Sequence, residues 1–247
     1  NRGHILVENS RFEGMLDDSI NVHSTSLKIT SISGSTIEVQ YMHSQSVGFE
    51  TVLPNEHIQF IKASTLELSE IRAVAAVRKM STTKLQITVN GSIPSGIAVG
   101  DAIENSDYYP SVTFRNNTVS NNKARGSLFT TPKQVIVEDN LFDYTSGSAL
   151  LLAGDAANWF ESGASRNVII RRNKLINPLT AQYQFTNGIF SFCPSISNVA
   201  GQKAFYHTNI RIEDNYIETS DVPLFYALSA ANVEFKNNQI VYNNDCP

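Results

Sequence analysis

The stretch Val135–Phe142 reads V-I-V-E-D-N-L-F, and its pattern recurs at five other places in the chain. The pattern is apolar, any residue, apolar, polar, polar, Asn, any residue, apolar. It returns, with Ser10 in place of the Asn in the first copy, in Ile5–Phe12, Val112–Val119, Val168–Leu175, Ile210–Ile217 and Val233–Ile240. The alternating apolar residues are typical of a half-buried strand. We interpret the Asn as a turn residue, because asparagine tolerates left-handed backbone and bonds neighbouring amides.

The spacing of the copies predicts a solenoid. From the second copy onward the Asn positions are separated by 23, 33, 42 and 23 residues; they are Asn117, Asn140, Asn173, Asn215 and Asn238. A base period of 23 residues, with longer loops in some turns, fits a parallel β-helix. In that fold each coil stacks on the next one and equivalent residues form ladders. We therefore predict an all-β chain organised as a parallel β-helix.

The residues between the first two copies have a different texture. From about Ser24 to Pro110, short alternating runs are separated by turn signals such as I-S-G-S-T and V-N-G-S-I-P-S-G. Closely spaced strands of this kind indicate a small antiparallel β-barrel or sandwich. We predict that residues 24–110 form this insertion, and that residues 1–23 and 111–247 form the β-helix. The segment Leu68–Val77 could form a helix, but we favour a strand there.

Composition narrows the classes of function. The 247 residues carry a net charge of −4 and a pI of about 5.7, and only 17% of them are charged. That share is below the usual quarter, and no basic field is present to attract a polyanion. We therefore expect no nucleic-acid partner. The apolar runs are only a few residues long, so we expect no insertion into a membrane.

The cysteines and the first residue bear on processing. Cys193 and Cys246 could form one disulfide or remain two separate thiols, and they lack the clustered ligands of a metal site. The chain begins at Asn1, without Met or a signal peptide, and inside a patterned strand segment. We therefore expect a processed or truncated piece of a longer protein.

A candidate site emerges when the coils are aligned by phase. Residues at equal phase in successive coils lie about 4.8 Å apart. The adjacent pair Asp17 and Asp18 follows Phe12 by five and six residues, and one coil on this phase falls near Arg125. The next coil leads into the loop 149–163. The polar and aromatic residues that follow the pair or lie in that loop are Asn21, His23, Asp155, Trp159 and Glu161.

This set suits a sugar site. Glycoside hydrolysis needs one carboxyl group to protonate the leaving oxygen and a second to act as base or nucleophile. Trp159, the only tryptophan, could pack against the apolar face of a pyranose. Arg125 could bond sugar hydroxyls and hold a carboxylate ionised. Repulsion between Asp17 and Asp18 could raise one of their pKa values.

Each of these residues also has a plainer interpretation. An Asp-Asp pair in a solenoid turn is more often a capped turn or an exposed acidic spot. Asn21 could bond a turn, His23 could be a stacked structural histidine, and Trp159 could anchor its loop. Glu161 could bond the turn that starts the next coil. The acids could also bind Ca²⁺, although the D-x-D spacing of calcium loops is absent.

Several blocks, in order, resemble the glycoside hydrolase family 110 α-galactosidases. They are I-L-V-E-N-S-R-F-E-G-M-L-D-D-S-I-N-V-H, R-G-S-L-F-T-T, S-A-L-L-L-A-G-D-A-A-N-W-F-E-S-G-A-S-R-N-V-I-I-R-R-N, and the segment 209–240. The resemblance covers essentially the whole chain, including a strand-rich insertion after the first block. L-D-D-S-I-N-V-H and G-D-A-A-N-W-F-E-S-G are specific, whereas the strand octets are shared by many β-helix proteins.

The resemblance implies a right-handed parallel β-helix with a β-barrel insertion. It implies exo-hydrolysis of terminal α-1,3-linked galactose with inversion, and no metal or other cofactor. It assigns catalytic carboxylates to Asp17 and Asp18, and it places Arg125, Asp155, Trp159 and Glu161 at the sugar pocket. The family also draws on the preceding coil, which this chain lacks, so this chain is expected to be the C-terminal portion of the catalytic unit.

The partner implied is a glycan with terminal α-galactose, together with an N-terminal portion of the same protein; the sequence leaves a homodimer open. We expect a secreted, periplasmic or cell-surface protein of bacterial type. Two other functions stay open. One is a polygalacturonase-like enzyme, whose groove should hold several Lys and Arg for its acidic substrate. The other is a non-catalytic carbohydrate-binding solenoid, in which the acids are capping groups.

Overall fold

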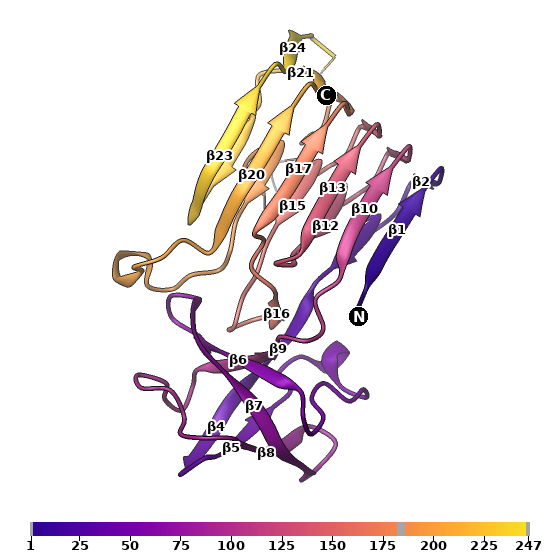
Figure 1. The fold of residues 1–247 in the computed structure, drawn as a ribbon. Helices are drawn as coiled ribbons and strands as arrows, with labels where there is room; N and C mark the ends of the chain where they lie inside the picture. Colours follow the sequence, from indigo (N-terminus) through magenta and orange to yellow (C-terminus); the bar gives the residue numbers. More distant parts are fainter. Residues whose placement is uncertain (1, 182–185, 246–247) are drawn as a thin grey trace.

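The computed structural model describes residues 2–181 and 186–245. These residues form strands and two short 3-10 segments, η1 (Ser44–Ser46) and η2 (Val199–Gly201), and no α-helix. No helix in this part of the chain is long and apolar enough to cross a membrane. Figure 1 shows two parts, a stack of parallel strands and a small antiparallel barrel that lies below the stack in this view.

The stack consists of three parallel sheets, and one pass of the chain through them is called a coil here. The repeated octets form the first sheet and begin the second. In spatial order, the first sheet contains β1 (His4–Glu8), β10 (Ser111–Arg115), β13 (Gln134–Glu138), β17 (Asn167–Arg171), β20 (His207–Glu213) and β23 (Ala230–Lys236). The second contains β2 (Arg11–Glu13), β11 (Thr118–Ser120), β14 (Leu141–Asp143), β18 (Lys174–Ile176), β21 (Tyr216–Thr219) and β24 (Gln239–Tyr242).

The third sheet carries the candidate site. Its strands are β3 (Ile20–Val22), β12 (Ser127–Phe129), β15 (Leu150–Leu152), β19 (Phe190–Phe192) and β22 (Phe225–Ala227). Equivalent residues pair in register, as the ladder prediction requires; Val112, for example, pairs with Val135, which pairs with Val168. The chain is therefore all-β with parallel sheets, as predicted.

The core of the stack is made of the inward-pointing apolar residues of the three sheets. Phe114, Phe129 and Phe142 are fully buried, and the ring centroid of Phe114 lies 5.7 Å from that of Phe129 and 6.3 Å from that of Phe142. Burying one such side chain contributes about 1.5–3 kcal/mol to stability. The ladders of large apolar residues therefore hold the coils together.

The repeated asparagines form a continuous hydrogen-bonded ladder. Asn173 is typical: its Oδ1 accepts hydrogen bonds from the backbone N–H and the Nδ2 of Asn140, at 3.0 and 2.9 Å. Its own Nδ2 donates to the carbonyl oxygen of Val137 and to Oδ1 of Asn215. The ladder runs from Asn117 to Asn238.

The left-handed turn residue is not the ladder asparagine, so that part of the interpretation was wrong. The residue before it takes the positive φ, at 52–58°; these residues are Asn9, Asn116, Asp139, Arg172, Asp214 and Asn237. The polar residue at the fifth position of the octet therefore turns the chain. The Asn side chain at the sixth position is then free to bond the neighbouring coil. The fifth residue of the octet thus turns the chain, and the sixth residue joins adjacent coils.

The inserted strands close into a six-stranded antiparallel barrel. The order around it is β4 (Ser24–Ser33), β5 (Thr36–Gln40), β8 (Lys84–Val89), β7 (Glu67–Lys79), β6 (His57–Lys62) and β9 (Ala102–Asn105), and β9 pairs with β4 again. Leu68–Val77 lies within β7, so the strand prediction is confirmed there. The short strand β16 (Glu161–Ser162) of the stack pairs antiparallel with the start of β4.

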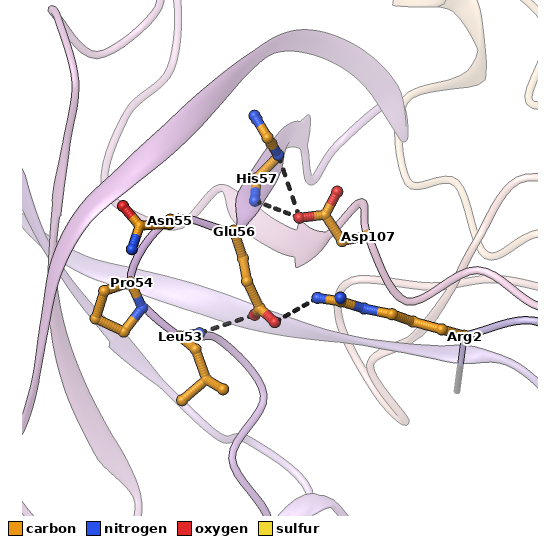
Figure 2. A pocket seen from close by; sticks show the side chains of 7 residues that line it. All are labelled: Arg2, Leu53, Pro54, Asn55, Glu56, His57 and Asp107. Carbon is orange, nitrogen blue, oxygen red and sulfur yellow. Dashed lines mark hydrogen bonds and ion pairs between the residues drawn. The ribbon is translucent and has the colours of Figure 1, made fainter.

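Polar contacts fix the barrel to the stack at the N-terminal side. Figure 2 shows this junction: the buried carboxylate of Glu56 accepts from Arg2 at 2.6 Å and from the backbone N–H of Leu53 at 2.9 Å. Asn105 also donates to Glu56, at 2.7 Å. On the other side, Lys203 donates its backbone N–H to Glu67 of β7. The barrel is thus held at two places, which makes it a fixed wall for a site beside it.

Candidate active site

A cavity of about 630 Å³ lies on the outer face of the third sheet. Asn21 of β3, Leu128 of β12 and Leu151 of β15 form its floor. They are register partners in adjacent strands, so their side chains point to the same face. The flanking residues of each strand, such as Val22 and Phe129, point into the core instead. The alternation of the third sheet therefore separates the floor of the cavity from the core.

Asp17, Asp18 and Arg125 lie together at one end of the cavity. Arg125 occupies the position that the phase alignment gives, one coil from Asp18. Its Nη2 lies 2.8 Å from Oδ2 of Asp18, and its backbone N–H donates to Oδ1 at 3.1 Å. Asp17 is exposed, and one of its oxygens accepts the backbone N–H of Asp18 at 2.9 Å. The two adjacent aspartates thus have unlike surroundings.

Burial raises the pKa of Asp18 to about 6. The Arg125 cation opposes that shift, and the neighbouring charge of Asp17 adds to it by a smaller amount. Repulsion from Asp17, the cause expected from the sequence, is therefore the smaller of the two causes that raise this pKa. Desolvation is the larger cause, because the side chain of Asp18 is only 6% exposed.

The loop that follows β15 is organised by Asp155. Oδ1 of its carboxylate accepts the backbone N–H groups of Ala157, Asn158 and Phe160, and Oδ2 accepts that of Trp159, at 2.7–3.2 Å. Asp155 borders the cavity, but its oxygens are engaged with its own loop. It is therefore a positioning residue for Trp159, which borders the cavity and is 54% exposed.

Glu161 joins the floor of the cavity to the barrel junction. Its backbone pairs with Thr25 of β4, and its carboxylate accepts from Nδ2 of Asn21 at 3.4 Å. Nε2 of His23 lies 3.5 Å from Oε1 of Glu161. The Nδ1 of His23 lies 2.7 Å from the carbonyl oxygen of Ser24, so Nδ1 must carry a proton. His23 therefore contacts the site through Glu161, while the other seven predicted residues line the cavity.

Sequence reasoning missed the remaining lining residues. They are Gln45, Leu128, Leu151, Ala153, Gly154, Asn158, Cys193 and Ser195. The phase alignment could have found Leu128 and Leu151, because they pair in register with Asn21. Gln45 carries no such signal, since it belongs to the inserted barrel. Burial raises the pKa of the Cys193 thiol, while Cys246 lies outside the described residues, so their pairing stays untested.

The sequence matches one family model and several curated proteins. The family model described as GLAA-B beta-barrel domain II matches residues 36–103, which lie within the barrel. Alpha-1,3-galactosidase B of Akkermansia muciniphila is 52% identical over 99% of this chain and 31% of its own length. Alpha-1,3-galactosidase B of Parabacteroides distasonis is 45% identical over 100% of this chain and 42% of its own length.

A more distant relative extends the same comparison. Alpha-1,3-galactosidase A of Bacteroides fragilis is 34% identical over 100% of this chain and 41% of its own length. The chain thus spans less than half the length of these three relatives. The chain is therefore homologous, over its whole length, to part of the alpha-1,3-galactosidases A and B.

Proposed function

We propose that the chain forms part of a glycoside hydrolase that removes terminal α-1,3-linked galactose from glycans with inversion. In this proposal the three parallel sheets are the coils of a right-handed parallel β-helix, and the cavity on the third sheet is the sugar site. The observation that carries the proposal is the meeting of Asp17, Asp18, Arg125 and Trp159 in one cavity. It is supported by the alpha-1,3-galactosidase names of relatives that match the chain throughout.

Asp18 is assigned the role of general base. A base works best when its pKa lies just below the working pH, because it is then ionised and still basic. Burial raises the pKa of Asp18 to about 6. Arg125 engages both carboxylate oxygens and so fixes their direction. Such a carboxylate can take a proton from a water molecule as that water attacks the anomeric carbon.

The general acid is assigned to Asp17 or Glu161. Inverting glycosidases hold their two carboxyl groups about 6.5–9.5 Å apart, which leaves room for the attacking water. Both residues border the cavity, and the carboxylate of Glu161 accepts a hydrogen bond from Asn21. Either could donate a proton to the glycosidic oxygen. The two assignments can be distinguished, because only the variant that lacks the acid, Asp17→Ala or Glu161→Ala, should depend strongly on a good leaving group.

The remaining residues bind the sugar or position those that do. The exposed ring of Trp159 offers an apolar surface for a pyranose. Asn21 presents an amide on the floor, and His23 contacts Glu161. The charge of the lining argues against polygalacturonate as substrate. Among its described residues are four carboxylates, namely Asp17, Asp18, Asp155 and Glu161, and one cation, Arg125. An acidic polymer would be repelled there.

The test uses the longest natural chain that contains this sequence and an α-1,3-linked galactose disaccharide. Proton NMR should show β-galactose as the first product, as inversion requires. Asp18→Ala should lose activity, and azide should restore it by forming β-galactosyl azide. The variant that lacks the acid, Asp17→Ala or Glu161→Ala, should keep its activity only on aryl galactosides with good leaving groups.

A control and two contrary outcomes complete this test. Asp221→Asn, which changes an exposed carboxylate outside the cavity lining, should behave as wild type. Full activity in Asp18→Ala would refute the assignment of the base. Binding of the disaccharide without any hydrolysis by the wild-type protein would refute the enzyme and favour a carbohydrate-binding solenoid.

A further inference from the structure

Gln45 of the barrel lines the same cavity as the acids of the stack. It lies in η1, in the loop between β5 and β6, more than 100 residues away in sequence from Asp155 and Trp159. Its side chain is exposed, and its amide makes no hydrogen bond to another residue in the described part of the chain. A side-chain amide has two donors and an acceptor, so Gln45 has its full bonding capacity available to a ligand.

The loop that carries Gln45 is held by its own contacts. His43 accepts the backbone N–H of Gln45 on its Nδ1 at 3.3 Å, and its carbonyl oxygen accepts from Oγ of Ser46 at 2.7 Å. Further along, the hydroxyl of the buried Tyr41 donates to the carbonyl oxygen of Phe49 at 3.1 Å. Thr51 donates to the same hydroxyl at 2.7 Å. The position of Gln45 is therefore set before any ligand binds.

One contact joins this loop to the aromatic residue of the site. The rings of His43 and Trp159 lie 4.5 Å apart between centroids, at an interplanar angle of 39°. Trp159 is in turn fixed through its backbone N–H by Asp155. The barrel loop and the loop after β15 thus contact each other beside the cavity, through His43 and Trp159. A displacement of either ring would move both Gln45 and Trp159.

We propose that Gln45 hydrogen-bonds a hydroxyl group of the bound glycan, and that the contact between the rings of His43 and Trp159 holds Gln45 in the sugar site. This inference rests on the proposed function. Sugar hydroxyls both donate and accept, and a neutral amide matches them without adding charge to a lining rich in carboxylates. Gln45 is thus a substrate-binding residue and His43 a positioning residue. The inserted barrel becomes a working wall of the site.

The experiment measures kcat and KM for the longest natural chain containing this sequence, on an α-1,3-linked galactose disaccharide and on an aryl α-galactoside. A neutral hydrogen bond contributes about 0.5–1.5 kcal/mol, so Gln45→Ala should raise KM roughly 2- to 10-fold, with kcat little changed. A rise in KM for both substrates would show that Gln45 contacts the galactose. A rise for the disaccharide alone would place it on the leaving sugar.

Variants of His43 test the positioning role. His43→Phe keeps a ring beside Trp159 but removes the Nδ1 acceptor of the Gln45 backbone N–H, so its KM should lie between the KM of wild type and that of His43→Ala. His43→Ala removes the ring and should reproduce the KM of Gln45→Ala. Trp159 is the only tryptophan in this chain, so its fluorescence emission reports the contact between the rings of His43 and Trp159 directly. In the 247-residue chain, His43→Ala should shift that emission to the red, because the indole becomes more exposed to water.

Gln86→Ala is the matched control, because Gln86 is a half-buried glutamine of barrel strand β8 outside the cavity lining. It should leave both KM and the Trp159 emission unchanged. An unchanged KM in Gln45→Ala, with an active wild type, would overturn this inference and leave the proposed function intact. A wild-type protein that hydrolyses neither galactoside would overturn the proposed function, and with it the ligand assigned to Gln45.

Discussion

Arg125 engages both carboxylate oxygens of Asp18, one through its guanidinium group at 2.8 Å and the other through its backbone N–H at 3.1 Å. The two residues are 107 positions apart in sequence and meet because they occupy equivalent places in adjacent coils. The cation lowers the pKa of Asp18, but burial raises it further, and the result is a pKa of about 6. A buried carboxyl group therefore titrates close to neutral pH at one end of the cavity.

The first prediction concerns the pH dependence of catalysis. If Asp18 is the base, kcat/KM should rise as the pH increases through about 6, because Asp18 then loses its proton. Arg125→Gln removes the cation that lowers this pKa, so the rise should move to a higher pH. Kinetics between pH 4.5 and 8.5 would measure both profiles. Arg211→Gln, at an exposed position of β20, should leave the profile in place. An unmoved profile in Arg125→Gln would contradict the coupling.

A second prediction concerns stability and follows from the same pKa. Because the pKa of Asp18 is raised in the folded state, its contribution to stability is fully present below the unfolded pKa of about 4 and is lost as the pH rises through about 6. The free energy of unfolding of wild type, minus that of Asp18→Asn, should therefore decrease between pH 4 and pH 7.5. The expected decrease is on the order of 2–3 kcal/mol.

Urea unfolding of both proteins at several pH values would measure this difference. The Asn side chain stays neutral throughout the range, so the change of this difference with pH reports the titration of Asp18, including its ion pair with Arg125. A difference that stays constant from pH 4 to pH 7.5 would show that the pKa of Asp18 is not raised by folding. Asp221→Asn supplies the control for the removal of an exposed carboxylate.

The third prediction concerns the asparagine ladder. Asn173→Ala would leave the backbone N–H and the Nδ2 of Asn140 without their acceptor, and the carbonyl oxygen of Val137 without its donor. These groups are buried, so the substitution should lower the free energy of unfolding by about 3 kcal/mol. Chemical denaturation would measure it. Asn167→Ala, at the exposed start of β17, should cost less than about 0.5 kcal/mol. Equal losses in both variants would refute the ladder's role.

The fourth prediction concerns the loop after β15. Asp155→Ala removes the acceptor of four backbone N–H groups, so the loop should lose its shape and Trp159 its place over the cavity. KM should rise at least 10-fold, while the global unfolding midpoint should change little because the loop lies outside the core of the stack. Asp155→Asn keeps one acceptor oxygen, so its KM should lie between the KM of wild type and that of Asp155→Ala. A wild-type KM in Asp155→Ala would show that the loop does not need this carboxylate.

The stack could be predicted from the sequence because its determinants are local and repeated. Each octet carries the same alternation, and the spacing of its asparagines gives the register. That register is also why Arg125 could be aligned with Asp18 before any coordinates were known. The repeat could not show which residue takes the left-handed turn. Asn tolerates that conformation well, and only the bonds of Asn140 and Asn173 to neighbouring coils show that their side chains are used elsewhere.

The barrel side of the site could not be predicted in the same way. Gln45 lies in a segment that follows no period of the stack, so nothing in the sequence relates it to Trp159. The cause of the raised pKa of Asp18 was also beyond the sequence. The sequence shows that two carboxylates are adjacent. Desolvation of Asp18, however, depends on which residues cover its side chain in the fold. The role of Asp155 likewise depends on loop geometry, since four bonds to its own backbone are invisible in G-D-A-A-N-W.

The asparagine ladder allows the stack to be lengthened or shortened by whole coils. Each asparagine of the ladder bonds to ladder asparagines only in the coils directly before and after its own. The loops between these asparagines differ in length without disturbing the register. Gene duplication or deletion of one whole coil would therefore lengthen or shorten the molecule by about one strand spacing, ~4.8 Å. Such a change away from β3, β12, β15 and β19 would leave the cavity as it is. A solenoid held by such a ladder can thus gain or lose a coil while keeping the same cavity.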